Sequence, residues 1–354
     1  MPDTPVALAW KRLSRRFKTP LRTATGEHAA RESLVVRVQL ADGRVGFAEA
    51  ASWPGFPVPA PEALEQELRS VKCEAGDASA TSSETRSRCA LTLHTSHFLI
   101  RTALDWARLG WGSTDAARPC AALLRDDADA PARVAAGFTT LKRKIGVGAA
   151  RDEQRAVAAL VRACGDGVKL RLDANGALNA RDCAHWCDFL SEFPEVEWLE
   201  QPMRVGAEPD MLAAGEKAGV ADRLALDESA CAADTLPGSW PGVLAVKPVL
   251  LGDLDAWRAR RAAYPQIAYS SAFESPFGRQ AALCVAAEDA RCGTGVPPVS
   301  EATQPCAGRA CHAFAVGFDT LGAFDDDLDA HAPGPVAATV ARDAAFWDGL
   351  WNRL

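Results

Sequence analysis

The stretch "TLKRKIG", residues 140–146, places two lysines two positions apart inside a run that otherwise reads as a buried strand. Side chains alternate between the two faces of a strand, so Lys142 and Lys144 point one way and Arg143 points the other. Two ammonium groups on one buried face repel each other and are costly to desolvate. A lone Lys-x-Lys is usually a solvated edge strand, so the meaning of this pair depends on the sequence around it.

Similar apolar runs recur between residues 120 and 320, separated by segments with helical periodicity. Parallel strands need a crossover of about a dozen residues, so this alternation predicts an α/β fold with a parallel (β/α) barrel. A doubly wound open sheet is the structural alternative. The eight runs are "AALLR", "TTLKRKI", "VKLRLDAN", "VEWLEQP", "RLALDES", "VLAVKPV", "QIAYSSAFES" and "HAFAVGFDT".

The first 60 residues follow a different pattern, with strands and turns instead of alternating strands and helices. The segment "ESLVVRVQLADGRVGFAEAA" reads as a hairpin that turns at Asp42 and Gly43. Residues 72–89 are small and polar, and residues 292–311 are rich in glycine and proline, so both are expected to be loops.

Composition limits the class of protein. The chain has 354 residues, 48% of them hydrophobic, and a formal net charge of -7, which suits an ordinary globular enzyme and gives no basic field for nucleic acid. No export leader and no apolar run of about 18 residues is visible, so we expect a cytoplasmic protein without a membrane contact.

The cysteines are expected to be reduced core residues. There are 11 of them, an odd number, and no Cys-x-x-Cys pair occurs. In "CAHWC", Cys183, Trp186, Cys187 and Leu190 follow helical spacing on one face, and His185 points away from both sulfurs.

Charged residues close the apolar runs. Lys142 and Lys144 end the second run, and single charged residues end the next four: Asp173, Glu200, Asp227 and Lys247. The three acidic residues are 27 positions apart in each case, about one strand-plus-helix unit. In a parallel barrel, all of these strand ends lie on the face where active sites form. Six charged groups are therefore expected to converge on one mouth.

Three clustered carboxylates need a counter-charge because like charges repel. A hard divalent cation with oxygen ligands provides it, which predicts Mg²⁺ on Asp173, Glu200 and Asp227; no His or Cys is placed for zinc. A desolvated lysine beside a second ammonium becomes a usable general base. Lys247, on the opposite side of the ring of strands, can act as a second acid or base or as a stabilising cation. This set of groups suits removal of a proton next to a carboxylate, with the metal stabilising the enediolate.

With these residues, the sequence resembles the enolase superfamily in its muconate lactonizing subgroup. Members carry the lysine pair on the second barrel strand, metal carboxylates on strands three to five and a lysine on strand six. The resemblance implies a (β/α)7β-type TIM barrel at residues 116–321 and an N-terminal α+β capping domain at residues 1–115, with residues 322–354 packing against that domain. It also implies Mg²⁺, for which Mn²⁺ could substitute.

Within the subgroup, three features resemble the o-succinylbenzoate synthases of menaquinone biosynthesis. "GFAEAASWPGFP" carries Glu49 before a turn at Pro54, Gly55 and Phe56, and "LRLDAN" places Arg171 two residues before Asp173. "YSSAFESPFG" and "VGFDTL" resemble the loops of strands seven and eight. The resemblance implies substrate binding by four residues: Arg171, Ser270, Ser271 and Gly317.

The implied reaction is a Mg²⁺-dependent syn dehydration of 2-succinyl-6-hydroxy-2,4-cyclohexadiene-1-carboxylate. Lys144 would take the proton alpha to the ring carboxylate and then assist loss of hydroxide, while Lys142 tunes Lys144 and Lys247 stabilises the intermediate. The partner is thus a small carboxylate substrate.

Other functions remain open at this point. An N-succinylamino acid racemase, a dipeptide epimerase or a cycloisomerase would use the same lysines, although dipeptide epimerases typically have an Asp-x-Asp where this chain has only Asp319. A non-catalytic binding protein on the same barrel is the alternative of another class.

Overall fold

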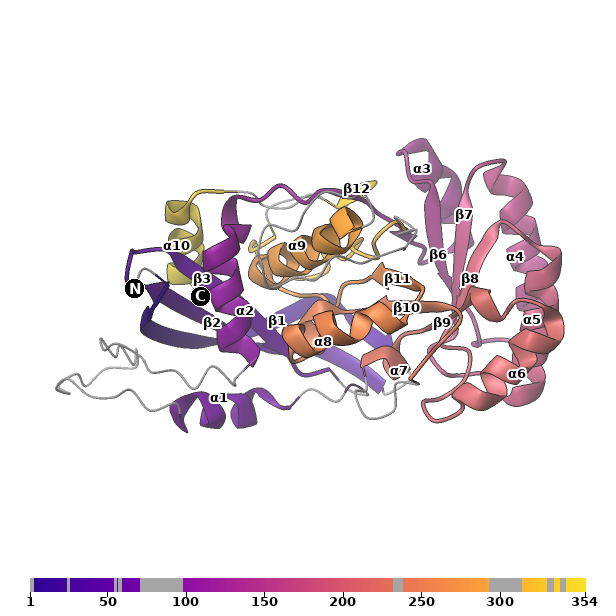
Figure 1. Cartoon of the computed structure of the whole chain (residues 1–354). Helices are drawn as coiled ribbons and strands as arrows, with labels where there is room; N and C mark the ends of the chain where they lie inside the picture. Colours follow the sequence, from indigo (N-terminus) through magenta and orange to yellow (C-terminus); the bar gives the residue numbers. More distant parts are fainter. Residues whose placement is uncertain are drawn as a thin grey trace.

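The computed structural model describes residues 3–23, 26–53, 56, 59–70, 98–231, 238–292, 314–329, 334–337 and 342–354. Two main sheets organise this part of the chain, a three-stranded antiparallel sheet and a seven-stranded parallel sheet. The antiparallel sheet comes first in the sequence and lies beside the parallel one (Figure 1).

The N-terminal sheet is a meander of three strands, β1 (Pro5–Thr23), β2 (Gly26–Leu40) and β3 (Val45–Ala51). The turn between β2 and β3 is closed by the Leu40 amide, which donates to the Arg44 carbonyl over 2.8 Å, with Gly43 at a φ of 91°. This confirms the hairpin predicted at Asp42 and Gly43. The helices α1 (Pro61–Ser70) and α2 (Phe98–Leu109) follow.

Helix α2 packs directly on the backbone of β3. A Cβ atom added to Gly46 would lie 1.8 Å from the Ala103 carbonyl oxygen, so only glycine allows this approach. The interface buries apolar side chains from the sheet and both helices, including Leu34, Val36, Leu64, Leu99 and Leu104.

The parallel sheet is built from the predicted apolar runs. In β10 all four residues are buried, which is typical of parallel strands covered on both faces. The strands are β5 (Ala122–Leu123), β6 (Thr140–Lys144), β7 (Lys169–Asp173), β8 (Val196–Glu200), β9 (Leu224–Leu226), β10 (Val243–Val246) and β11 (Gln266–Tyr269), paired in that order.

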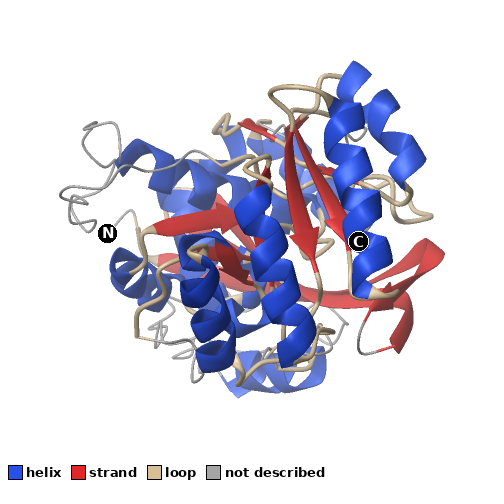
Figure 2. Ribbon diagram, turned by 90° about the vertical axis from the view of Figure 1, so that its right-hand side faces the viewer, coloured by secondary structure: helices blue, strands red, loops and turns tan. Residues whose placement is uncertain are grey.

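Helices connect successive strands, as a (β/α) barrel requires. They are α3 (Ala130–Ala135), α4 (Ala150–Cys164), α5 (Ala180–Glu192), α6 (Glu208–Ala218), α7 (Glu228–Cys231), α8 (Leu254–Arg260) and α9 (Pro276–Cys292). Short 3₁₀ turns occur at Trp111–Ser113, Asp127–Asp129, Ala221–Arg223, Pro248–Leu250 and Arg261–Ala263. Helices α4, α5 and α6 lie on the side away from the N-terminal sheet, and the view in Figure 2 shows helices packed around the strands.

The last predicted run closes the barrel through two parallel bridges. Val316 pairs with Cys120 just before β5, and Gly317 pairs with Ser270 just after β11. The Ala121 amide donates to the Val316 carbonyl over 2.9 Å, and the Gly317 amide donates to the Tyr269 carbonyl over 2.8 Å. The first and last strands of the sheet are thus joined, which confirms the barrel over the open sheet.

The C-terminal helix α10 (Ala344–Arg353) returns to the N-terminal sheet (Figure 1). The rings of Trp347 and Trp351 lie 6.4 and 6.0 Å from the Phe47 ring in β3. Two short strands, β4 (Arg118–Pro119) and β12 (Val336–Ala337), pair near the junction of the two parts. The predicted domain boundaries near residues 115 and 321 remain predictions.

Other predictions from the sequence have separate outcomes. Cys183, Trp186, Cys187 and Leu190 are buried on one face of α5 and His185 is exposed, as predicted. Pro54, Gly55, the loop at residues 72–89 and residues 293–311 of the second predicted loop lie outside the described residues. No helix in the described ranges is long and apolar enough to span a membrane.

Candidate active site

The ends of three neighbouring barrel strands bring charged residues into register. Lys144 on β6 pairs with Asp173 on β7, and Asp173 pairs with Glu200 on β8. Lys142 lies on the same face of β6 as Lys144, whereas Arg143 points the other way and binds Asp127 at 2.6 Å. The alternation read from the sequence therefore separates Arg143, which forms an ion pair on the other face of the strand, from Lys142 and Lys144, which face the barrel interior.

Asp227 and Lys247 follow directly after β9 and β10 and complete the ring of charges. Their side chains form an ion pair. Gln201 holds the backbone at this point: its side-chain carbonyl accepts from the Asp227 amide at 3.0 Å and from the Ser229 amide at 3.2 Å. The ends of β8 and β9 are thereby tied together, which fixes the spacing of Glu200 and Asp227.

Lys142 provides the charge that compensates the first two carboxylates. Its Nζ lies 2.8 Å from Asp173 Oδ2 and 2.7 Å from Glu200 Oε1. Burial works against the charged form of Lys142, but these two carboxylates outweigh it and raise the pKa of the ammonium group. Burial also opposes ionisation of Asp173, yet Lys142 lowers the pKa of that carboxyl group. Burial dominates for Glu200 and raises its pKa.

Lys247 is held in its charged form in the same way. Burial disfavours its charge, but the neighbouring Asp227 carboxylate raises the pKa of the ammonium group. Glu228, the next residue along, is mostly buried, and burial together with Asp227 raises the pKa of its carboxyl group to about 8. One Glu228 carboxylate oxygen is buried without a hydrogen-bond partner in the described structure.

The donor set suits a hard divalent cation. As the side chains lie, no three Asp, Glu, His or Cys residues in the described ranges are grouped closely enough to hold a metal ion. The carboxylates instead contact lysine ammonium groups, so a single cation, Lys142 Nζ, already bridges Asp173 and Glu200. Three buried carboxylates at neighbouring strand ends are ligands that Mg²⁺ prefers. The residues therefore fit a magnesium ion once the side chains turn from the lysines toward it.

A cavity of about 370 Å³ opens at this end of the barrel. Lys142, Lys144, Asp173, Asp227 and Lys247 line its polar side. An apolar wall comes partly from the N-terminal part of the chain, through Leu21, Trp53 and Phe56, and partly from Phe273 in the loop after β11. The cavity is large enough for a small organic acid and combines one charged wall with one apolar wall.

Backbone strain is concentrated around this cavity. In the described residues, the non-glycine positions with positive φ are Asn175 (44°), Gln201 (35°) and Phe273 (57°), and all three line the cavity. Such conformations cost about 1–3 kcal/mol each and persist only where surrounding contacts enforce them. Clusters of this kind are typical of functional sites, so the cavity is the candidate site.

The residues predicted to bind substrate are only partly brought together. Ser270, Ser271 and Gly317 line the cavity. The Ser271 hydroxyl is engaged with Glu274 Oε2 at 3.0 Å and Thr320 Oγ1 at 2.8 Å, and the Gly317 amide donates to the Tyr269 carbonyl. These polar groups are therefore bound to other groups of the protein, and these contacts fix the shape of the cavity wall.

Arg171 does not reach the cavity. It lies two residues before Asp173 on the same face of β7, one layer deeper in the barrel, and is buried. Its guanidinium lies 3.9 Å from the Trp198 ring centre, with Nε donating to Glu197 at 2.7 Å and Nη1 donating to the Ala315 carbonyl at 2.7 Å. Its position supports packing inside the barrel, beneath the site, and gives no support to direct substrate contact.

Several cavity residues were missed by the sequence analysis: Glu228, Asn175, Arg204, Thr320 and Phe273. Glu228 and Asn175 each lie within two residues of a predicted metal ligand, so their position directly after an apolar run was an available signal. Phe273 and the N-terminal wall residues carry no such signal, because only the three-dimensional packing brings them to the barrel mouth.

Comparison with known proteins shows which family the chain resembles. Residues 125–236, which contain Lys142, Lys144 and all three carboxylates, match the family model described as Enolase C-terminal domain-like. An o-succinylbenzoate synthase from Thermosynechococcus vestitus is 29% identical over 366 residues, covering 98% of each chain. These matches show that the chain is similar to enolase superfamily proteins.

A solved structure and a shorter sequence match extend this similarity. The crystal structure of o-succinylbenzoate synthase from Thermosynechococcus elongatus BP-1, complexed with Mg in its active site, is similar with a TM-score of 0.72 and 25% identity, covering 99% of this chain and 100% of that one. A hydrophobic dipeptide epimerase from Enterococcus faecalis is 40% identical over 72 residues, 20% of each chain. The predicted capped TIM barrel is confirmed by the structural likeness.

Proposed function

We propose that this protein is an o-succinylbenzoate synthase that dehydrates 2-succinyl-6-hydroxy-2,4-cyclohexadiene-1-carboxylate to 2-succinylbenzoate, as a lyase of menaquinone biosynthesis. The observation that carries the proposal is that Lys144 at the end of β6 and Lys247 directly after β10 line one cavity with Asp173 and Asp227, while the third carboxylate, Glu200, is buried at the end of the neighbouring strand β8. The similarity to o-succinylbenzoate synthases over 98% of the chain supports this substrate.

Asp173, Glu200 and Asp227 would hold Mg²⁺, for which Mn²⁺ is the proposed substitute. When bound, the ion would stabilise the negative charge that develops on the substrate carboxylate as its alpha proton leaves. The same charge would be stabilised by Lys247, whose ammonium group is kept protonated by its ion pair with Asp227.

Lys144 is the proposed base because it is the lysine of the pair that is exposed at the cavity, whereas Lys142 is fixed between two carboxylates. The neutral Lys144 amine takes the alpha proton, and the resulting ammonium returns that proton to the leaving hydroxyl on the same face of the ring. One proton and one hydroxide leave as water, and the ring becomes aromatic. Lys142, on the same face of β6, is the proposed residue that tunes Lys144.

The alternative within the superfamily is a racemase or epimerase, for which the local 40% identity to a dipeptide epimerase is the supporting observation. An epimerase needs a group for the substrate ammonium, and Asp319 lines the cavity. However, Asp319 already accepts from the Leu123 amide at 3.1 Å and lies 3.4 Å from Arg133. Both contacts use Oδ2, and Asp319 Oδ1 has no hydrogen-bond partner in the described structure, so the preference for dehydration rests on the similarity to o-succinylbenzoate synthase over 98% of the chain.

The decisive experiment follows aromatisation of the cyclohexadiene substrate by absorbance with Mg²⁺ and with excess chelator. Lys144→Ala should lose more than about 10³-fold in kcat, because it removes the group that moves the proton. Lys169→Ala is the matched control: Lys169 is an exposed lysine at the opposite end of β7. A Lys144→Ala rate close to that of Lys169→Ala would refute the proposal.

If the wild type does not accelerate aromatisation, deuterium uptake into N-succinylamino acids in heavy water tests the racemase alternative. Absence of proton exchange on any of these carboxylates, together with Mg²⁺ binding, would instead support a non-catalytic barrel. We also propose a cytoplasmic location, without nucleic-acid or membrane partners, because the substrate is a small metabolite.

A further inference from the structure

Two irregular loops form one side of the cavity, and both need an external support. The loop after β11 contributes Ser271 and Phe273, and the segment after Gly317 contributes Thr320. The loops touch through the Ser271 and Thr320 hydroxyl groups, 2.8 Å apart. Neither belongs to a strand or helix at these positions, so the shape of this wall depends on what holds the loops in place.

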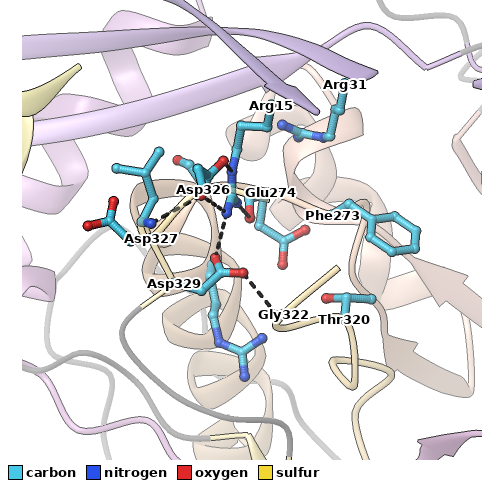
Figure 3. A network of polar contacts seen from close by, with 12 residues as sticks. Arg15, Arg31, Phe273, Glu274, Thr320, Gly322, Asp326, Asp327 and Asp329 are labelled. Atoms are coloured by element: carbon cyan, nitrogen blue, oxygen red, sulfur yellow. Dashed lines mark hydrogen bonds and ion pairs between the residues drawn. The ribbon is translucent and has the colours of Figure 1, made fainter. Parts of the chain in front are cut away.

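The support comes from a buried arginine in the N-terminal sheet. Arg15 on β1 is 1% exposed and binds Asp326 through Nε and Nη2, both at 2.8 Å (Figure 3). Its Nη2 also lies 3.0 Å from Asp329, and its Nη1 lies 3.3 Å from the Glu274 carbonyl oxygen. One side chain therefore contacts both loops at once.

The backbone around Arg15 adds to the same junction. The Asp325 amide donates to the Arg16 carbonyl over 3.0 Å, and the Lys18 amide donates to the Ala323 carbonyl over 2.9 Å. The Phe324 ring lies 3.8 Å below the Arg15 guanidinium. Residues 323–326 thus pair through their backbone with the edge of strand β1.

A second buried pair holds the other end of the β11 loop. Arg31 on β2 donates to the Ala272 carbonyl over 2.7 Å and to Glu49 over 2.6 Å, and Glu49 accepts from the Ser275 amide over 2.9 Å. Arg31 is the direct cross-strand partner of Arg15. Like charges opposite each other destabilise a sheet. Buried ion pairs are moreover poor sources of stability compared with apolar packing, so their best-attested role is to specify one arrangement.

The residue placed by this arrangement is Phe273. Its ring stacks on Trp53 from the N-terminal part, with centroids 5.9 Å apart and planes at 16°, and packs edge-on to Phe17 at 5.4 Å. Phe273 and Trp53 both line the cavity, and Phe273 is held at positive φ. The apolar wall of the cavity is therefore assembled across the junction that Arg15 fixes.

We propose that Arg15, through Asp326 and Asp329, is a positioning residue for substrate specificity, which locks the Phe273 and Thr320 loops into the one cavity shape that fits the substrate. This inference rests on the proposed dehydration for its kinetic test. Arg15 touches neither the lysines nor the carboxylates of the site, so its removal acts on substrate binding and leaves the proton-transfer groups in place.

The test compares Arg15→Met with Arg12→Met, a matched control on the same strand whose ion pairs with Glu62 and Glu65 lie at the surface. Arg15→Met should raise KM about tenfold, equivalent to about 1.4 kcal/mol, with kcat within about twofold of the wild type. Arg15→Lys keeps the charge but loses the bidentate contact with Asp326, so its KM should lie between that of the wild type and that of Arg15→Met. Arg12→Met should leave both constants unchanged.

Hydrogen–deuterium exchange gives a readout that needs no turnover. Uptake at residues 270–275 and 320–329 should rise in Arg15→Met and stay at the wild-type level in Arg12→Met. If Arg15→Met does not fold, Asp329→Asn takes its place, with the same direction of change in KM and uptake. Unchanged KM or unchanged uptake in a folded variant would overturn the inference, as would a fall in kcat at constant KM.

The two proposals fail in different ways. Wild-type protein that does not aromatise the substrate refutes the proposed dehydration, whereas increased loop exchange in Arg15→Met alone would still support the positioning role. Full wild-type turnover with unaltered KM in Arg15→Met refutes the positioning role and leaves the dehydration intact.

Discussion

The Arg31–Glu49 pair predicts a large loss of stability on removal of one charge. Both side chains are fully buried, and Glu49 accepts from Arg31 at 2.6 Å, from the Ser275 amide at 2.9 Å and from the Gly278 amide at 3.2 Å. In Glu49→Gln one acceptor oxygen becomes an NH₂ donor that faces other donors, and Arg31 keeps a buried charge without its counter-ion. Breaking a buried pair in this way costs about 3–5 kcal/mol.

The loss is measured as the free energy of unfolding from urea denaturation at pH 7. Arg12→Met, which removes exposed ion pairs on the same sheet, should cost no more than about 1 kcal/mol. The double variant Arg31→Met, Glu49→Gln should lose at least about 2 kcal/mol less than the sum of its single variants, because no charge is left unpaired. A Glu49→Gln loss no larger than that of Arg12→Met would refute the reasoning.

The same pair gives the stability a pH dependence of known sign. Burial opposes ionisation of Glu49, but Arg31 and Ser275 outweigh it and lower the pKa below the ordinary value of 4.5. A carboxyl group with a depressed pKa in the folded state contributes stability above its unfolded pKa and loses it as the pH falls through the folded value. The difference in unfolding free energy between wild type and Glu49→Gln should therefore be full above about pH 5 and shrink below about pH 4.

Two further predictions concern the packing of the N-terminal part and the metal. Gly46→Ala should cost about 3 kcal/mol in urea denaturation, because the added Cβ would meet the Ala103 carbonyl at 1.8 Å; a loss below about 0.5 kcal/mol would contradict the close approach of α2. Mg²⁺ at about 100 times its Kd should raise the unfolding free energy by about 2.7 kcal/mol. Asp173→Asn should remove most of that increase, and an equal increase in the variant would place the ion elsewhere.

The sequence by itself determined the barrel and the identity of its charged mouth. The period-2 alternation in "TLKRKIG" separated Lys142 and Lys144 from Arg143, and the structure pairs Arg143 with Asp127 on the other face. The 27-residue spacing placed Asp173, Glu200 and Asp227 at the ends of consecutive strands, because each strand-plus-helix unit has a nearly fixed length. Local patterns are sufficient for these features, since strand faces and strand ends follow from chain geometry alone.

Only the tertiary structure decided how far each side chain reaches and which distant residues meet. Arg171 faces the same way along β7 as Asp173, so its sequence position resembles that of a site residue. It nevertheless lies one layer below the cavity, because only the folded barrel determines which level of a strand borders the open mouth. Arg15 and Asp326 are 311 positions apart, and neither closes an apolar run. Their contact results from packing of the N-terminal sheet against the barrel loops. That packing sums many weak contacts between segments remote in sequence, so no local period encodes it.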